Sequence, residues 1–293
     1  MNHEFGMEQK LKELNPELHR RFTSSVFALQ YYLSKYRLMF PEYTDHSELH
    51  SLTVIGFCNQ LIGDQIDCLN ADELYVLLMS CYLHDSGMGI TPEQYREFSG
   101  QIDFGNYFDF CSRDDYPTII RDFHHEFSGC FIRKFGPLLD IPSESHLQAI
   151  IQVSRGHRRT DLMDESAYPA DFPVPGGNQI CLPYLATIIR LADEIDVSAN
   201  RNPKLLFDIE SLSDQKQIML NRMILAVKEL RVTETAFILL IRNTDPQVME
   251  QLYLMVRKMQ KTLDYCRSVV SGRTAYTITQ KIIKMEMTAE QDG

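Results

Sequence analysis

Apolar residues recur at helical spacing almost without a break from Asn15 to about residue 200, and this pattern limits the fold more than any other feature of the chain. Successive amphipathic segments of this kind bury their apolar faces by packing helix against helix. Asn15-Pro16 and Asn70 have the residue types that begin helices, because Asn caps free backbone N–H groups and Pro is tolerated in the first turn. The expected helices cover residues 15–37, 47–62, 70–83, 91–100, 116–135, 146–154 and 178–197. We therefore predict a mainly α fold, built as a helical bundle.

The character of the sequence changes after about residue 205. Residues 229–242 are rich in β-branched and aromatic types and predict a strand or hairpin, 247–270 predict an amphipathic helix, and 277–287 alternate as a strand does. We therefore divide the chain into a helical domain over 1–205 and a small α+β region over 206–293. Residues 164–177 contain Pro169, Pro173 and Pro175 and predict an irregular loop, either a plain connection or a lid over a site.

The net charge of the sequence limits which kinds of molecule the protein can bind. Lys and Arg number 29 against 40 for Asp and Glu, a net charge of −11, and such a surface repels the backbone of nucleic acids. A small anionic substrate stays compatible with this charge if cations are concentrated at one site. No apolar run approaches the roughly 20 residues of a membrane span, and the N-terminus lacks the apolar segment of a secretory signal. We expect a cytoplasmic protein whose seven cysteines, none in a CxxC pair, are reduced.

Ligand-type residues interrupt three of the predicted helices. His84 and Asp85 are adjacent where an apolar helix gives way to a loop, and His50 lies at the polar edge of an amphipathic helix. Asp193 stands in the apolar phrase IIRLADEID, with Asp196 on roughly the same face. Asp is seldom buried unless it is paired or bound to a metal. Because imidazole and carboxylate are common ligands of divalent ions, we predict a buried metal site formed by His50, His84, Asp85 and Asp193.

The order of these residues resembles the H…HD…D signature of the HD superfamily of metal-dependent phosphohydrolases. The flanking phrases HSLTV, YLHDSG and IIRLADEID support the resemblance, which covers residues 45–200. The phrase LPYLATIIRLADEIDVSANR is most similar to HD domains of the HD-CE kind and to the HD portion of exopolyphosphatase-like enzymes. The resemblance implies a helical HD domain that cleaves a phosphoester, such as a nucleotide, by attack of a hydroxide bound to the metal. It also favours Asp193 over Asp196, because Asp193 follows Leu-Ala in the matched phrase.

Two further histidines resemble the extended pattern of binuclear members of that superfamily. His125 and His157 would bind a second ion, and Asp85 would bridge the two ions. His124 is the alternative to His125, since neighbours on a helix point about 100° apart and only one can face the metals. His46 precedes His50 by one helical turn and would share its face, with either a direct or a supporting role. The resemblance thus implies one or two divalent ions, Mn²⁺, Fe²⁺, Mg²⁺ or Zn²⁺, without distinguishing among them.

Basic residues near these positions are the candidates to bind phosphate. Arg155, Arg158 and Arg159 follow the sixth predicted helix, and Arg201 and Lys204 follow the helix of Asp193. Arginine suits bidentate phosphate contacts. We select Arg155, Arg158, Arg201 and Lys204 for substrate binding, and assign catalytic roles to Asp85, His157 and Arg201.

Two features of the sequence leave alternatives open. It lacks the Gly-Tyr-Pro motif of cyclic di-nucleotide enzymes and the synthetase domain that accompanies stringent-response hydrolases, so the substrate within the phosphoester class is undetermined. A metal-containing nucleotide sensor with little turnover would require the same ligands as an enzyme. The region 206–293 could complete the pocket, form a homodimer or bind a partner protein.

Overall fold

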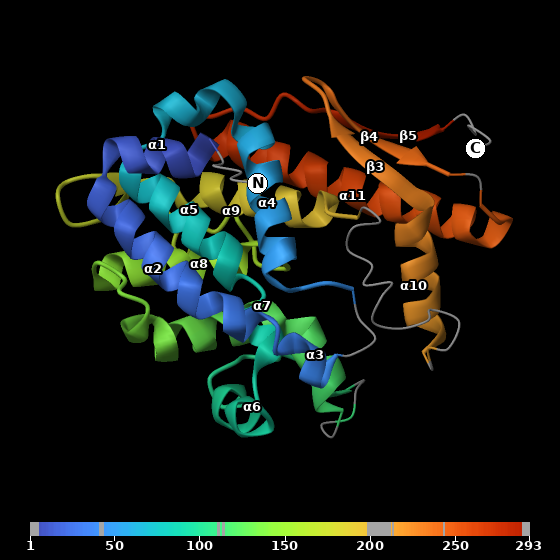
Figure 1. The fold of residues 1–293 in the computed structure, drawn as a ribbon, viewed down its shortest axis with the longest axis horizontal. Helices are drawn as coiled ribbons and strands as arrows, with labels where there is room; N and C mark the ends of the chain where they lie inside the picture. The colour runs from blue at the N-terminus through green and yellow to red at the C-terminus, as the bar shows by residue number, and fades with distance from the viewer. Residues whose placement is uncertain are drawn as a thin grey trace.

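The structure is a computed structural model that describes residues 6–40, 44–109, 112, 115–197, 212, 214–242 and 244–288. Helices form most of it, and the sheets within these ranges are a two-stranded ribbon and a three-stranded sheet (Figure 1). The prediction of a mainly α fold is confirmed. None of the described helices is long and apolar enough to cross a membrane.

The secondary structure follows the chain in three stretches. The bundle contains α1 (Gly6–Leu14), α2 (Pro16–Leu33), α3 (Tyr36–Met39), α4 (Glu48–Ile62), α5 (Ala71–Leu83), α6 (Pro92–Ser99), α7 (Tyr116–Phe135), α8 (Glu144–Gly156) and α9 (Leu182–Ile195). Between α8 and α9 lie the short antiparallel strands β1 (Phe172–Pro173) and β2 (Gln179–Ile180). The C-terminal stretch contains α10 (Gln215–Ala226), β3 (Val227–Val232), β4 (Ala236–Ile241), α11 (Pro246–Arg273) and β5 (Ile282–Met287).

Helix α5 is the central helix of the bundle. Its first turn is closed by a reciprocal cap, in which Asn70 Oδ1 accepts the N–H of Glu73 and the Glu73 carboxylate accepts the N–H of Asn70. Every side chain from Leu74 to Leu83 is buried. Because neighbouring helices surround it, the residue that ends α5 is delivered into the interior of the protein. That residue is His84.

The C-terminal region is joined to the bundle by the 28-residue helix α11. Helix α11 extends from the flank of α9 to the sheet, whose strand order is β3-β4-β5 with β5 parallel to β4 (Figure 1). The buried apolar residues of α11, such as Leu252 and Leu263, belong to the same hydrophobic core as those of α9. The core is therefore continuous across the two predicted domains, whose boundary at 205 lies outside the described residues and stays a prediction.

The structure differs from the predicted elements in their number and in some of their bounds. The helix predicted over 15–37 is divided into α2 and α3, and the strand predicted over 277–287 begins only at Ile282. Helices α1 and α10 were not predicted. The helix predicted over 178–197 begins instead at Leu182, since Gln179 and Ile180 pair with Pro173 and Phe172. Residues 229–242, expected as a strand or hairpin, lie in the antiparallel hairpin β3–β4.

Candidate metal centre

The His84-Asp85 pair lies at a tight junction between α5 and the 3₁₀ turn Ser86–Gly89. Ser128 of α7 fixes this junction: its hydroxyl donates to the His84 carbonyl at 2.6 Å and accepts the Gly87 N–H at 2.8 Å. A Cβ atom at Gly87 would stand 2.4 Å from the carbonyl oxygen of His124, so only glycine allows this approach. The small residues after the doublet therefore bring α7 and its histidines beside Asp85.

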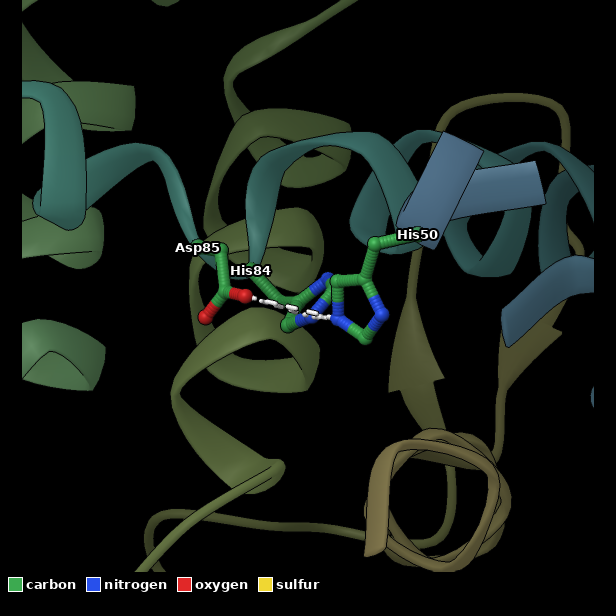
Figure 2. Close-up of side chains that lie close together, drawn as sticks. All are labelled: His50, His84 and Asp85. Carbon is green, nitrogen blue, oxygen red and sulfur yellow. Dashed lines mark hydrogen bonds and ion pairs between the residues drawn. The ribbon is translucent and has the colours of Figure 1, made fainter. Parts of the chain in front are cut away.

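The first group of ligand atoms is formed by His50, His84 and Asp85, which converge in Figure 2. The Nε2 atoms of His50 and His84 are 3.2 Å apart, and each lies 3.4 Å from Asp85 Oδ2. Asp193 joins them from the last turn of α9, with its Oδ1 3.3 Å from His50 Nε2 and 3.9 Å from His84 Nε2. The four residues predicted as ligands of one ion are therefore assembled at a single point.

The second group of ligand atoms lies on the other side of Asp85 and contains His124 and His157. Their Nε2 atoms are 2.9 Å apart and lie 3.4 and 3.7 Å from Asp85 Oδ1. Each oxygen of the Asp85 carboxylate thus faces one pair of imidazoles. If metal ions were bound, the two oxygens of Asp85 would be available to different ions.

His124, and not His125 as we had predicted, places its imidazole beside Asp85. Helix α7 contains a kink at Phe123, whose φ of −115° and ψ of 17° are non-helical, and the kink sets which of the two neighbours turns inward. The ring of His125 lies nearly parallel to that of Phe123, and its Nε2 is 3.7 Å from the Glu126 carboxylate. The alternative that the sequence left open, His124, is the one whose imidazole reaches Asp85.

The second nitrogen of each clustered imidazole is held by an oxygen atom. Nδ1 lies 2.7 Å from Asp196 Oδ2 in His50, 3.0 Å from the Cys81 carbonyl in His84, 2.7 Å from the Arg121 carbonyl in His124, and 2.5 Å from the Ser154 carbonyl in His157. Carbonyl and carboxylate oxygens only accept, so Nδ1 carries the proton in all four rings. The lone pairs of the four Nε2 atoms therefore point into the cluster, as they do in metal-binding histidines.

Two facing lone pairs repel each other unless a cation lies between them. Burial lowers the pKa of His157 to about 3 and holds the pKa of His124 well below its usual value, so a proton does not supply that cation near pH 7. Burial alone would raise the pKa of the Asp85 and Asp193 carboxyls, but the neighbouring imidazoles hold both pKa values well below the usual range. The residue types present, imidazoles and carboxylates, therefore fit divalent metal ions.

Two residues support the cluster without belonging to either group. Asp196, which we had weighed as an alternative ligand to Asp193, holds Nδ1 of His50. His46 donates from Nδ1 to the Thr44 carbonyl at 2.6 Å and places its Nε2 4.0 Å from Asp85 Oδ2. Sequence spacing indicated the shared face of His46 and His50 but carried no signal for the pairing of His50 with Asp196, which joins α4 to the end of α9.

The Asp196→Asn variant tests this supporting role. An amide can rotate its NH₂ group toward His50, which forces the imidazole out of the tautomer that leaves Nε2 free. We expect metal affinity to fall by about 10- to 100-fold, the usual effect of losing such a partner, while the helical content stays unchanged. Metal titration of the EDTA-treated protein measures the affinity, and circular dichroism measures the fold. An affinity equal to wild type would show that Asp196 does not orient His50.

A pocket of about 370 Å³ opens onto the cluster. Asp85, Asp193, His46 and His124 line its inner end, and Arg121, Arg158 and Lys258 contribute positive charge. The C-terminal region supplies an apolar wall, formed by Leu220, Met223, Ile224, Leu254 and Met255. Arg121 and Lys258 were not identified from the sequence, because only the packing of α7 and α11 brings them to this pocket.

The predicted phosphate-binding residues are distributed unevenly around the pocket. Arg158 lines it. Arg155 points elsewhere, since its guanidinium pairs with Glu126 at 2.8 Å and its side chain packs over Gly129. Arg159 pairs with Asp122 at 3.2 Å. Arg201 and Lys204 lie outside the described residues, so their roles remain predictions.

Comparison with known families agrees with this geometry. The HD-CE family model matches residues 40–268, which is more than half of the chain. The chain belongs to the HD-CE family. The HD-CE match includes every residue of the metal cluster and also most of α11, so it continues beyond the predicted boundary at 205. Comparisons with curated proteins and with solved structures found no match.

Proposed function

We propose that this HD-CE protein is a divalent-metal-dependent phosphohydrolase with a binuclear centre. One observation carries the proposal: two pairs of buried imidazoles present facing Nε2 lone pairs, with one oxygen of Asp85 directed at each pair. A core built only for stability would avoid gathering six ligand-type side chains, five of them buried and Asp193 partly buried, around one carboxylate, because unpaired buried polar groups cost free energy. Imidazole with carboxylate suits Mn²⁺, Fe²⁺ or Zn²⁺, and Mg²⁺ less well.

The chemistry of the bound metals fits hydrolysis. When bound, such ions activate water for attack and neutralise charge on the phosphoryl oxygens. The new bond joins the water oxygen to phosphorus, the bond from phosphorus to the leaving oxygen breaks, and the water proton is transferred to the leaving oxygen through the solvent or a side chain. His46 is the best placed candidate for that transfer, since it lines the pocket beside Asp85.

The chain's own residues orient the substrate. Arg121 and Arg158 line the pocket beside Asp85 and are placed to bind the phosphoryl oxygens. His157 was predicted as a catalytic residue, but both of its ring nitrogens face other partners, which favours a role as ligand. The apolar wall from α10 and α11 suits the non-phosphate part of the substrate. Cations beside an apolar wall support a nucleotide as substrate.

The proposal is tested on the purified protein by metal analysis together with turnover. We expect bound metal after purification, hydrolysis of generic phosphoesters or of nucleotides with added Mn²⁺, and loss of activity in EDTA that Mn²⁺ restores. Bound metal with nucleotide binding but no turnover of any phosphoester would support a nucleotide sensor instead. A protein that binds no divalent ion at micromolar concentration would contradict both readings.

A further inference from the structure

A second pocket of about 340 Å³ lies beside the metal centre and is strongly basic. It is lined by Arg158, Arg159, Arg190, Lys258, Lys261, Glu194, His157, Thr262 and Tyr265. With histidine neutral, five cations, the lining carboxylate of Glu194 and the Asp122 carboxylate that pairs with Arg159 give 5 − 2, a charge of +3, in a chain whose net charge is −11. We call these residues the basic annex. Such a concentration of positive charge in an acidic protein attracts anions to one place.

The basic annex shares part of its wall with the pocket that opens onto the metal cluster. Arg158, Glu194 and Lys258 line both of them. His157 belongs to the wall of the annex and also to the second group of ligand atoms. A substrate in the metal pocket would therefore lie against a wall whose cations, Arg158 and Lys258, also face the annex.

The cations of the annex differ in how strongly they are engaged. Arg190 is buried, and its guanidinium donates to the carbonyls of Gly156, Arg158 and Thr160, so it holds the backbone that carries His157. Lys258 pairs with Glu194 at 3.0 Å. Neither Arg158 nor Lys261 has a carboxylate within ion-pair distance among the residues that the structure describes. An anion in the annex would therefore gain two cations without breaking an existing pair.

We propose that the basic annex binds a second phosphoryl group of the substrate, with Arg158 and Lys261 as its main contacts. The proposal rests on the proposed phosphohydrolase function and makes it more specific: the substrate carries at least two phosphoryl groups, as in a nucleoside diphosphate or a longer phosphate chain. Lys261 and Lys258 make α11, outside the helical domain predicted from the sequence, a determinant of specificity. Two cations on one dianionic group explain the charge of the annex better than solvation alone does.

The first test measures binding of inorganic orthophosphate and pyrophosphate by calorimetry to the full-length protein in EDTA, where neither probe can act through a metal. We expect pyrophosphate to bind at least about tenfold more tightly than orthophosphate, and Lys261→Gln to weaken pyrophosphate binding by about fivefold, the effect of losing one exposed charge. Arg257→Gln is the matched control, since Arg257 is exposed on α11 and lines neither pocket. Equal affinity for the two probes, or equal effects of the two variants, would overturn the proposal.

The second test separates this proposal from the proposed function. Asp85→Asn should abolish turnover but should not weaken pyrophosphate binding in EDTA, because the substitution only removes a negative charge and Asp85 does not line the annex. If the wild type hydrolyses no phosphoester yet binds pyrophosphate through Lys261, the proposed enzyme activity fails and the annex stands. The reverse outcome is also possible: the wild type hydrolyses phosphomonoesters, but Lys261→Gln changes neither pyrophosphate binding nor kcat/KM for nucleoside diphosphates. In that case the proposed phosphate site in the annex is wrong and the proposed enzyme activity stands.

Discussion

The Asp85→Asn variant is expected to lose at least one of the two proposed metal ions and to lower kcat for phosphoester hydrolysis by at least about 1000-fold. Asp85 is the one residue shared by the two groups of ligand atoms, with Oδ2 facing His50 and His84 and Oδ1 facing His124 and His157. An amide offers one oxygen and no negative charge, so it can serve one ion at most. Metal ions contribute several kcal/mol to such reactions, and each 1.36 kcal/mol changes the rate tenfold.

Asp72→Asn is the matched control for this experiment. Asp72 is also a mostly buried carboxylate that pairs with a histidine, at 2.8 Å from His146 Nε2, but it lies at the opposite end of α5 from the cluster. We expect it to lower the free energy of unfolding by roughly 1–3 kcal/mol and to leave both ions in place. Elemental analysis of the desalted proteins measures the metal, and thermal unfolding measures the stability. Two ions retained by Asp85→Asn would contradict the bridging role.

Part of the site could be predicted because it depends on local signals. An apolar helix that ends in His84-Asp85 carries both residues into the interior, whichever elements pack around it. Likewise, a carboxylate in the apolar helix α9 needs a polar or metal partner, whatever the position of α9 in the fold. His50, His84, Asp85 and Asp193 were therefore identified as candidate ligands from their residue types and surroundings. The mainly α fold could be predicted for the same reason, since the apolar periodicity of α4, α5 and α7 sets their helical state before any tertiary contact is known.

The other features of the site depend on how each helix is rotated about its axis and packed against its neighbours. Which of His124 and His125 faces the centre is decided by the kink at Phe123, and two adjacent histidines give no sequence signal for the rotation of a kinked helix. Lys258 reaches the pocket only because α11 packs along α9, some 60 residues away in sequence. Asp196 was weighed as a ligand, yet it acts on the far side of His50, because α9 has ended by that point and the chain turns away.

The number of ions gives the sharpest comparison between the two neighbouring histidines. We expect His124→Ala to bind one divalent ion and His125→Ala to bind two. Without His124, the second ion keeps only His157 and Asp85 Oδ1 as protein ligands, while the first keeps His50, His84, Asp85 Oδ2 and Asp193. Without His125, every ligand of both ions remains, because the His125 ring lies against Phe123 and its Nε2 faces Glu126.

The two variants control for each other, because both remove a buried imidazole from the same helix. Calorimetric titration of EDTA-treated protein with Mn²⁺ gives the stoichiometry, and unfolding in EDTA gives the cost of the lost side chain separately from the metal. Burial lowers the pKa of His125 to about 2 in the folded protein. Below about pH 6.5 the unfolded chain therefore takes up a proton at His125 that the folded protein does not, which destabilises the wild type. The His125→Ala variant lacks this group and should lose less stability than the wild type as the pH falls. If His125→Ala lost an ion and His124→Ala kept both, the kink at Phe123 would have been assigned the wrong direction, and with it the second half of the metal centre.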